Sequence, residues 1–325
     1  MPARPLLLHD PVFLEHDTGP GHVERPDRLR AIDAELARQG LLDRFDRVDP
    51  RPATDDELLR LHTPAYLDRL ADACRRGLGY IDTPDSAICP ETERVARLAA
   101  GGCLELAERL ARGDAERALG LVRPPGHHAE ADRSMGFCLY ANAALTADHL
   151  ARRLGKSAVV DFDLHHGNGT QHLLEDRADV LVVNLHEDPA VQYPGTGFAH
   201  ETGRGAGEGF TLNLPMPPGT DDRAWLGAFD RVAAPALERF APEALVISAG
   251  FDAAVRDPLG HLEITTDGFA AMADRLVSLG ERLAEAHGRR CPVLAVLEGG
   301  YDLGALGQGV AALAERLCGP VSPGG

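Results

Sequence analysis

The ten residues from Asp161 to Thr170, with the sequence DFDLHHGNGT, constrain this chain more than any other stretch. The run Ala158-Val159-Val160 comes directly before them, and a short β-branched run of this kind is typical of a buried strand. Because side chains alternate along an extended backbone, Asp161, Asp163 and His165 would point to one side. Carboxylate and imidazole groups suit Zn²⁺, and burying their charges without a partner or a metal would be costly. The stretch predicts a metal site at a strand end; the alternative is a strand followed by a polar, glycine-rich turn.

The length of the chain allows one large α/β domain or two small ones. Its 325 residues contain no repeat, linker or change of composition, so we expect a single catalytic domain over residues 1–325. No apolar run approaches the roughly 20 residues that span a bilayer, and the apolar segment near the N-terminus is too short for a signal peptide. These features predict a cytoplasmic protein without a membrane partner.

Charge and cysteine content narrow the classes of partner. The formal net charge of −17 would repel phosphates, so nucleic acid is not an expected partner, whereas a cationic substrate is compatible with it. The six cysteines form no CxxC pair and indicate neither a zinc knuckle nor a disulfide framework. We expect most of them to be small buried hydrophobic residues.

Strand-like and helix-like segments alternate along the chain. This alternation predicts an α/β fold with a mainly parallel central sheet and helices on both faces. The predicted strands are residues 118–122, 158–162, 180–185, 210–214, 244–248 and 293–297. One predicted helix begins near residue 26, five cover residues 55–61, 64–74, 91–112, 223–240 and 268–287, and two more end near residues 154 and 317. Residues 1–22 and 77–90 are expected to be irregular.

Four of the apolar strands end, at their carboxyl side, in polar residues. These are the pair His127-His128, the residues 161–168, Asp252 and Tyr301. In open α/β sheets ligands bind at the carboxyl ends of the strands. We therefore expect one site built from all four.

The residue types at these strand ends suit amide hydrolysis. Asp163, His165 and Asp252 would supply three metal ligands and leave one position free, as in a catalytic zinc site. Such a metal polarises a carbonyl group and acidifies a bound water.

The remaining polar side chains would complete this chemistry. His127 and His128 would move protons to and from the water and the leaving group. Tyr301 would donate a hydrogen bond to the developing oxyanion. Taken singly, a His or an Asp at a strand end is more often a structural cap, and such a tyrosine more often packs; the joint occurrence carries the prediction.

Five further motifs accompany DFDLHHGNGT in a fixed order: Arg123-Pro124-Pro125-Gly126-His127-His128, Gly136-Phe137-Cys138, Tyr193-Pro194-Gly195-Thr196-Gly197, Gly250-Phe251-Asp252-Ala253 and Glu298-Gly299-Gly300-Tyr301. In these motifs the chain resembles the zinc-dependent histone deacetylases, from Arg25 to Tyr301. The likeness is closest to the class II enzymes and their bacterial relatives, the histone-deacetylase-like amidohydrolases and acetylpolyamine amidohydrolases. It implies the arginase/deacetylase fold and one catalytic Zn²⁺.

The resemblance also implies roles for individual residues. The three predicted metal ligands match the zinc ligands of the family. His127 and His128 match the tandem catalytic histidines, of which the second is the main general base and acid. Asp161 would hydrogen-bond the first histidine, and Asn168 the second, where class I members have Asp.

On the substrate side, the resemblance implies a narrow channel. Phe137 and Tyr193 would be its aromatic walls, and Gly136 would offer a backbone carbonyl group. Arg28 matches an arginine near an internal cavity that handles acetate.

Structural K⁺ ions are implied as well. One would lie beside the zinc, with Asn184 in place of the usual serine, and would bind carbonyl groups of Asp161, Asp163, His165 and Leu185. A second would involve Leu174, Arg177, Val180 and Phe210.

The expected substrate is an acetylated lysine of a peptide or protein, or an acetylated polyamine. In one branch of the family, polyamine selectivity accompanies a glutamate seven residues after the third ligand, where this chain has Leu259. An apolar residue there favours acyl-lysine, in a tube without a carboxylate for a second ammonium group. The acyl-chain preference and the oligomeric state stay open, and a homo-oligomer is possible.

Two other functions compete with a deacetylase. A metal-binding regulator without catalysis would be expected to lack the tyrosine or a histidine, yet Tyr301, His127 and His128 are all present. A two-metal ureohydrolase of the related arginase fold would need more carboxylates around a metal pair.

Overall fold

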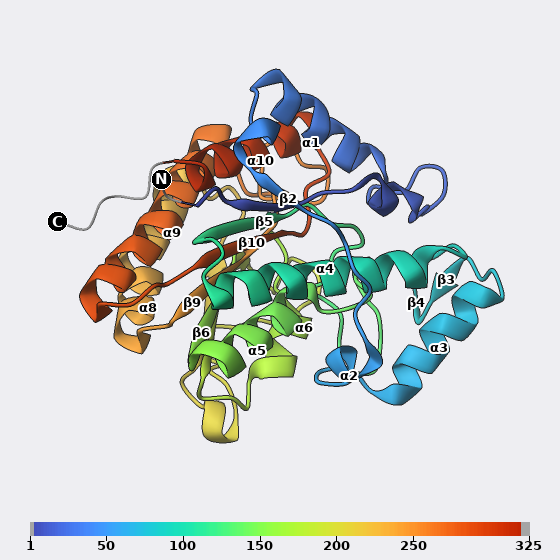
Figure 1. Cartoon of the computed structure of the whole chain (residues 1–325), viewed down its shortest axis with the longest axis horizontal. Helices are drawn as coiled ribbons and strands as arrows, with labels where there is room; N and C mark the ends of the chain where they lie inside the picture. The colour runs from blue at the N-terminus through green and yellow to red at the C-terminus, as the bar shows by residue number, and fades with distance from the viewer. Residues whose placement is uncertain (1–2, 320–325) are drawn as a thin grey trace.

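The computed structural model describes residues 3–319, and an eight-stranded parallel sheet lies at their centre (Figure 1). The strand order is β2-β1-β5-β10-β9-β6-β7-β8, and every pair within it is parallel. The strands are β1 Leu6–Leu8, β2 Asp46–Val48, β5 Arg117–Gly120, β6 Ser157–Asp161, β7 Val180–Glu187, β8 Thr211–Met216, β9 Ala244–Ala249 and β10 Val293–Leu297.

Helices cover both faces of this sheet, as the alternation of segments predicts. Figure 1 shows α1, α9 and α10 together on one side and α4, α5 and α6 on the other. The helices are α1 Asp27–Arg38, α2 Asp55–Leu58, α3 Pro64–Arg75, α4 Thr92–Arg112, α5 Asn142–Leu154, α6 Asn168–Leu174, α7 Asp222–Ala228, α8 Ala234–Phe240, α9 Thr266–His287 and α10 Leu303–Leu317. Within residues 3–319, none of the helices combines the length and apolar character needed to cross a membrane.

The position of β6 inside the sheet explains why its sequence is so apolar. It pairs with β9 on one side and β7 on the other, and all five of its residues are buried. With helices on both faces, such a strand has no solvent-facing side, so it reads as a continuous apolar run. Its carboxyl end leads directly into the DFDLHHGNGT stretch.

Two strands at one edge of the sheet lie where no strand was predicted. β1 falls in the segment expected to be irregular, and β2 in a segment without a prediction. Each has three residues, too few for a pattern of alternation, and β2 is partly exposed. β1 is a strand because β2 and β5 pair with it on either side.

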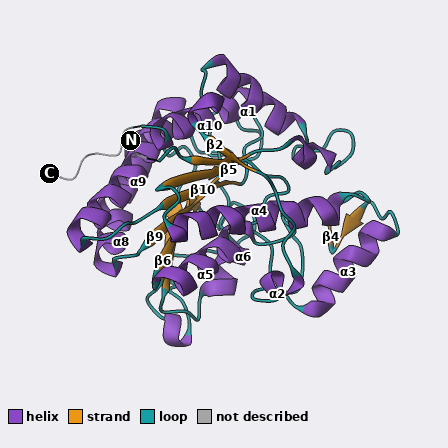
Figure 2. Ribbon diagram, viewed as in Figure 1, coloured by secondary structure: helices purple, strands orange, loops and turns teal. Residues whose placement is uncertain are grey.

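The segment 77–90 is not the plain surface loop that its sequence suggests. Residues Tyr80–Ile81 (β3) and Thr83–Ala87 (β4) form an antiparallel pair. Figure 2 shows β4 apart from the central sheet, beside α3. This hairpin brings one of its side chains to the site described below.

The helix predicted over residues 223–240 is interrupted by a π-helical turn, η4, over Phe229–Ala233. Pro235 follows this turn at the start of α8. Proline has no backbone N–H and its ring clashes with the carbonyl group four residues earlier, so a regular α-helix is unfavourable there.

Candidate active site

Three buried ligand-type side chains converge at the carboxyl ends of β6 and β9. His165 Nδ1 lies 3.1 Å from Asp163 Oδ1 and 3.1 Å from Asp252 Oδ2. One potential ligand atom from each residue lies within 4.8 Å of the other two. We call these residues the carboxylate–histidine trio.

Backbone donors hold the two carboxylates of the trio in place. Asp252 Oδ1 accepts a hydrogen bond from the N–H of Leu164 (2.8 Å), and Asp163 Oδ2 accepts one from Gly299 (2.8 Å). The carboxylates are therefore oriented by the loops after β6 and β10, with one oxygen of each left toward His165.

The trio concentrates negative charge away from water. Although burial opposes the charged imidazole, hydrogen bonds to Asp163 and Asp252 raise the pKa of His165 to about 10. Burial and the neighbouring Asp163 carboxylate raise the pKa of Asp252 to about 7. A cluster with these properties favours a bound cation, either a proton or a metal.

Two glycines make this close approach possible. A Cβ atom at Gly250 would lie 2.0 Å from Asp163 Oδ2, and one at Gly299 would lie 2.2 Å from Asp252 Oδ2. Both distances are far below van der Waals contact, so only glycine fits at these positions while the carboxylates stay in place.

The two adjacent histidines lie beside the trio, each with its own partner. The rings of His127 and His128 are 4.0 Å apart between centroids. His127 Nδ1 lies 3.1 Å from Asp161 Oδ2, and His128 Nδ1 lies 2.6 Å from Asn168 Oδ1. These pairings are the two that the family resemblance implies.

The surroundings of the two histidines shift their pKa values in opposite directions. Burial lowers the pKa of His127, but the carboxylates of Asp163 and Asp161 outweigh it and raise that pKa well above its usual value. Burial and the nearby His127 hold the pKa of His128 well below its usual value. The pair is therefore arranged as one cationic and one neutral imidazole, and the neutral one can accept a proton.

Glu298 is a buried acid of the site to which the sequence assigned no role, although it opens the Glu-Gly-Gly-Tyr motif. Its Oε2 accepts hydrogen bonds from the N–H groups of Gly126 (2.7 Å) and His127 (3.1 Å). It fixes the backbone that carries the histidines. Burial raises the pKa of Glu298 to about 7.

A cavity of about 220 Å³ opens over these residues, and the four residues predicted to bind the substrate all line it. Tyr193 packs edge-on to the ring of His128, with centroids 5.2 Å apart, and Phe137 packs edge-on to Tyr301 at 5.8 Å. The lining residues are Asp85, His128, Gly136, Phe137, His165, Gln192, Tyr193, Leu259 and Tyr301.

The expectation of a channel without a carboxylate is wrong, because Asp85 lines the cavity. It comes from β4 and lines the cavity with Leu259. Its Oδ2 accepts a hydrogen bond from the N–H of Gly136 (3.2 Å), while its Oδ1 is buried without a hydrogen-bond partner among the residues described. No local pattern in residues 77–90 marks this aspartate, because only the tertiary fold brings the hairpin to the cavity.

Asp257 ties together the two loops that carry Leu259 and Tyr301. Its Oδ2 accepts hydrogen bonds from the N–H groups of Tyr301 (2.6 Å) and Asp302 (3.0 Å). Its Oδ1 accepts one from the N–H of Leu259 (3.1 Å). The tyrosine and the leucine thus share one buried anchor.

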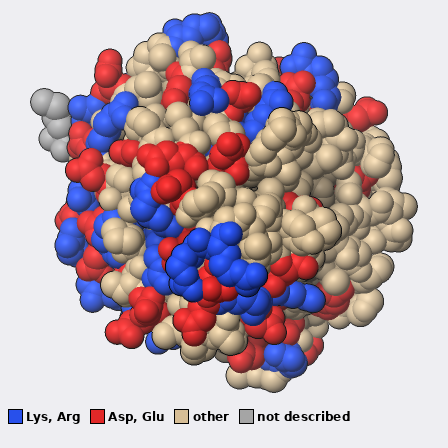
Figure 3. Space-filling view, turned by 90° about the vertical axis from the view of Figure 1, so that its right-hand side faces the viewer, with Lys and Arg blue, Asp and Glu red and all other residues tan. Residues whose placement is uncertain are grey.

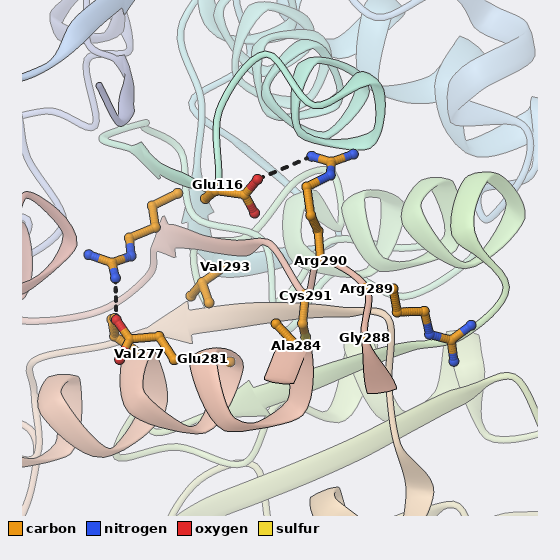
Figure 4. A pocket seen from close by; sticks show the side chains of 11 residues that line it. Glu116, Val277, Glu281, Ala284, Gly288, Arg289, Arg290, Cys291 and Val293 are labelled. Atoms are coloured by element: carbon orange, nitrogen blue, oxygen red, sulfur yellow. Dashed lines mark hydrogen bonds and ion pairs between the residues drawn. The ribbon is translucent and has the colours of Figure 1, made fainter. Parts of the chain in front are cut away.

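A larger cavity lies elsewhere, and none of the predicted site residues lines it. It has a volume of about 430 Å³ and lies at the amino ends of β5 and β10, against α9 (Figure 4). Charged side chains around it are paired with one another, as in Glu116 with Arg290 (3.6 Å) and Arg117 with Glu281. The smaller cavity, at the opposite ends of the strands, is the one lined by predicted site residues.

The surface carries charges of both signs. On the face seen in Figure 3, acidic and basic side chains are interspersed, and uncharged residues gather around a hollow on one side. Basic side chains gather below the centre of this view, with acidic side chains beside them.

Comparisons with known proteins find close relatives. The family model described as "Histone deacetylase domain" matches residues 22–317. The chain is 39% identical over 307 residues to a histone deacetylase-like amidohydrolase of Pseudomonas aeruginosa, covering 92% of this chain and 78% of that one. It is 40% identical over 316 residues to a probable deacetylase of Methanothermobacter thermautotrophicus, covering 97% and 91%. The crystal structure of the HDA15 HD domain superposes with a TM-score of 0.90 at 36% identity, covering 97% of this chain and 90% of that one.

Proposed function

Because this chain belongs to the histone deacetylase family and has the arginase/deacetylase fold, we propose that it is a zinc-dependent deacetylase whose catalytic domain spans residues 1–325. Its reaction is the hydrolysis of an acetyl-lysine amide, which releases acetate and a free amine. The observation that carries this proposal is the convergence of the carboxylate–histidine trio and the two histidines beside one cavity, which His128 and His165 line.

The trio fits a zinc ion by the chemistry of its donors. Two carboxylates and one imidazole, all buried, are borderline-hard ligands of the kind found in catalytic zinc sites. Three protein ligands leave a position for water or substrate. When bound, zinc supplies polarisation of the amide carbonyl and acidification of water.

The chain's own residues move the protons. His128 is neutral and lines the cavity, so it can take a proton from the attacking water and give it to the leaving amine. His127 faces Asp161 and remains cationic, which stabilises negative charge that develops beside it.

Tyr301 donates a hydrogen bond to the developing oxyanion. Burial raises the pKa of its hydroxyl group well above the usual value, so that group keeps its proton. The guanidinium of Arg28 lies over the Tyr301 ring, 5.0 Å from its centre, and stabilises the position of the ring by a cation–π contact.

The cavity walls favour a lysine side chain as the acyl carrier. Phe137, Tyr193 and Leu259 offer apolar surface to its four methylene groups, each of which gains about 0.8 kcal/mol on burial. An acetylated polyamine is the second candidate, and Asp85 is the observation that favours it. The unpaired Oδ1 of Asp85 can accept a hydrogen bond from either an ammonium group or a peptide N–H.

A structural K⁺ beside the zinc site is part of the proposal. Asn184 Oδ1 is buried and has no hydrogen-bond partner among the described residues, so an acceptor is left for a cation there. Its Nδ2 is already used, donating to Asn213 Oδ1 at 2.9 Å.

A cytoplasmic location is also proposed. All six cysteines are free thiols, four of them buried, which is typical of proteins in reducing compartments.

Turnover and metal content of the purified, zinc-loaded protein test this proposal. Acetyl-lysine peptides, N-acetylated polyamines and longer acyl groups should be compared, and we expect acetyl-lysine peptides to be hydrolysed. Asp252→Ala should abolish zinc binding and turnover, while the exposed Asp267→Ala should keep both. Unchanged zinc content in Asp252→Ala would contradict the ligand assignment. Stable zinc binding without turnover of any amide would favour a regulator.

A further inference from the structure

We propose that Glu130 is a positioning residue that sets the orientation of the Asn168 amide and, through it, the tautomer of His128. This inference rests on the proposed function, because it assigns a cause to the free nitrogen that His128 presents to the cavity. Sequence patterns gave Glu130 no role.

A chain of hydrogen bonds connects the three residues. His128 Nδ1 lies 2.6 Å from Asn168 Oδ1. Asn168 Nδ2 donates to Glu130 Oε1 at 2.6 Å. The same Oε1 lies 2.8 Å from Nδ1 of His172, whose side chain is 39% exposed. The chain thus runs from the cavity to the surface.

Glu130 determines which atom donates in each of these hydrogen bonds. An ionised carboxylate only accepts hydrogen bonds, so it must face the NH₂ group of Asn168. The carbonyl oxygen of the amide then faces His128, whose Nδ1 must carry the proton in order to donate. Nε2 of His128 is left as the unprotonated nitrogen that can act as a base.

Glu130 is needed because the partner of His128, Asn168, is a neutral amide. The Asp161 carboxylate can only accept a hydrogen bond, so by itself it requires a proton on Nδ1 of His127. The Asn168 amide could present either its oxygen or its nitrogen to His128, and the nitrogen would favour the opposite tautomer. Among residues 3–319, the one other hydrogen-bond acceptor for Asn168 Nδ2 is the weak acceptor Met135 Sδ at 3.3 Å.

The local structure brings two side-chain donors to the Glu130 carboxylate. Asn168 and His172 are four residues apart at the start of α6, so both reach the carboxylate from one face of the helix. The hydrogen bond that His172 donates to Glu130 raises the pKa of His172, which favours the charged imidazole beside this buried acid. The backbone is fixed as well, because the carbonyl group of Glu130 accepts from His62 Nδ1 at 2.9 Å.

Exchanging the hydrogen-bond roles of the two side chains tests the proposal. Glu130→Ala should lower kcat by about 10- to 100-fold with little change in KM, the range found for outer-shell residues that orient a site. Asn168→Asp should also lose activity, because two carboxylates would face each other. In the double variant Glu130→Gln, Asn168→Asp, the new amide can donate to the new carboxylate, and kcat should recover by about tenfold or more over Asn168→Asp.

The matched control is Glu108→Gln, which disrupts a Glu–His pair of similar geometry with His149 (2.9 Å), remote from the cavity. It should leave kcat unchanged. Double-variant activity no higher than that of Asn168→Asp, as expected for independent structural losses, would overturn the proposal. So would full activity of Asn168→Asp.

A second measurement does not depend on turnover. In ¹⁵N spectra of histidine-labelled protein, the His128 signals, assigned by their loss in His128→Ala, should show a single Nδ1–H tautomer. Glu130→Ala should give a mixture of tautomers or the Nε2–H form. An unchanged Nδ1–H signature would overturn the proposal even if the protein proved inactive on every amide.

Discussion

At the residue scale, Tyr301 offers the most direct separation of chemistry from packing. Tyr301→Phe keeps the ring between Arg28 and Phe137 and removes only the hydroxyl group. Loss of one oxyanion donor costs about 10²–10³ in rate, so we expect kcat to fall by that factor. Zinc content and Tm should stay at the parent values. A kcat close to that of the parent would show that this tyrosine only packs.

The two histidines should differ in their effect on catalysis. His128 is the neutral member with a nitrogen free for proton transfer, whereas the carboxylates of Asp163 and Asp161 favour the cationic form of His127. We therefore expect His128→Ala to lower kcat at least as much as His127→Ala, measured on the best substrate with zinc bound. A greater loss in His127→Ala would reverse the assigned roles.

At the element scale, the glycines that follow the strands decide how closely the ligands can meet. Gly299 comes two residues after the end of β10, and a Cβ there would lie 2.5 Å from Asp163 Oδ2 as well as against Asp252. We expect Gly299→Ala to displace at least one carboxylate and to lower zinc affinity by tenfold or more, measured by competition with a chelating dye.

Gly304→Ala is the matched control for this substitution. Gly304 lies in the first turn of α10, and a Cβ there would meet its nearest neighbours at 3.4 Å, an ordinary contact. Alanine is also the better helix former. This variant should bind zinc like the parent. A Gly299→Ala protein with full zinc affinity would show that the carboxylates can move without loss.

At the scale of the whole molecule, substrate choice depends on residues far apart in the chain. Leu259 lies on the loop anchored by Asp257, and Asp85 on the hairpin beside α3, yet both line one cavity. We expect a higher kcat/KM for acetyl-lysine peptides than for N8-acetylspermidine. Leu259→Glu should shift the ratio toward the polyamine, because it adds an acceptor for an ammonium group.

Asp85→Asn tests whether the Asp85 carboxylate binds an ammonium group of a polyamine or a peptide N–H. It should reduce turnover of the acetylated polyamine more than that of the peptide, since an amide still accepts a hydrogen bond but does not balance a positive charge. Preference of the parent for N8-acetylspermidine by tenfold, about 1.4 kcal/mol, would contradict the peptide-deacetylase proposal and favour the polyamine alternative.

The sequence by itself predicted the interior of the sheet and the position of the site within it. β6, β7, β9 and β10 are buried on both faces, so their apolar runs are visible in a single stretch of residues. The polar residues directly after β6 are likewise local, since strand alternation and spacing along the chain relate Asp161, Asp163 and His165 to one another. The motif order then predicted the family, which the comparisons confirm.

Only the tertiary structure decided which distant groups complete the site. β1 needs β2 and β5 to become a strand, and Asp85 reaches the cavity only because the hairpin packs there. Glu130 meets Asn168, and Asp257 meets Tyr301, across 38 and 44 residues of sequence. Hydrogen bonds of this kind depend on distance and direction in space, and no periodicity along the chain encodes them. The residues proposed to do the chemistry could therefore be predicted from the sequence, together with Asp161 and Asn168, whereas Asp85, Glu130 and Asp257 could not.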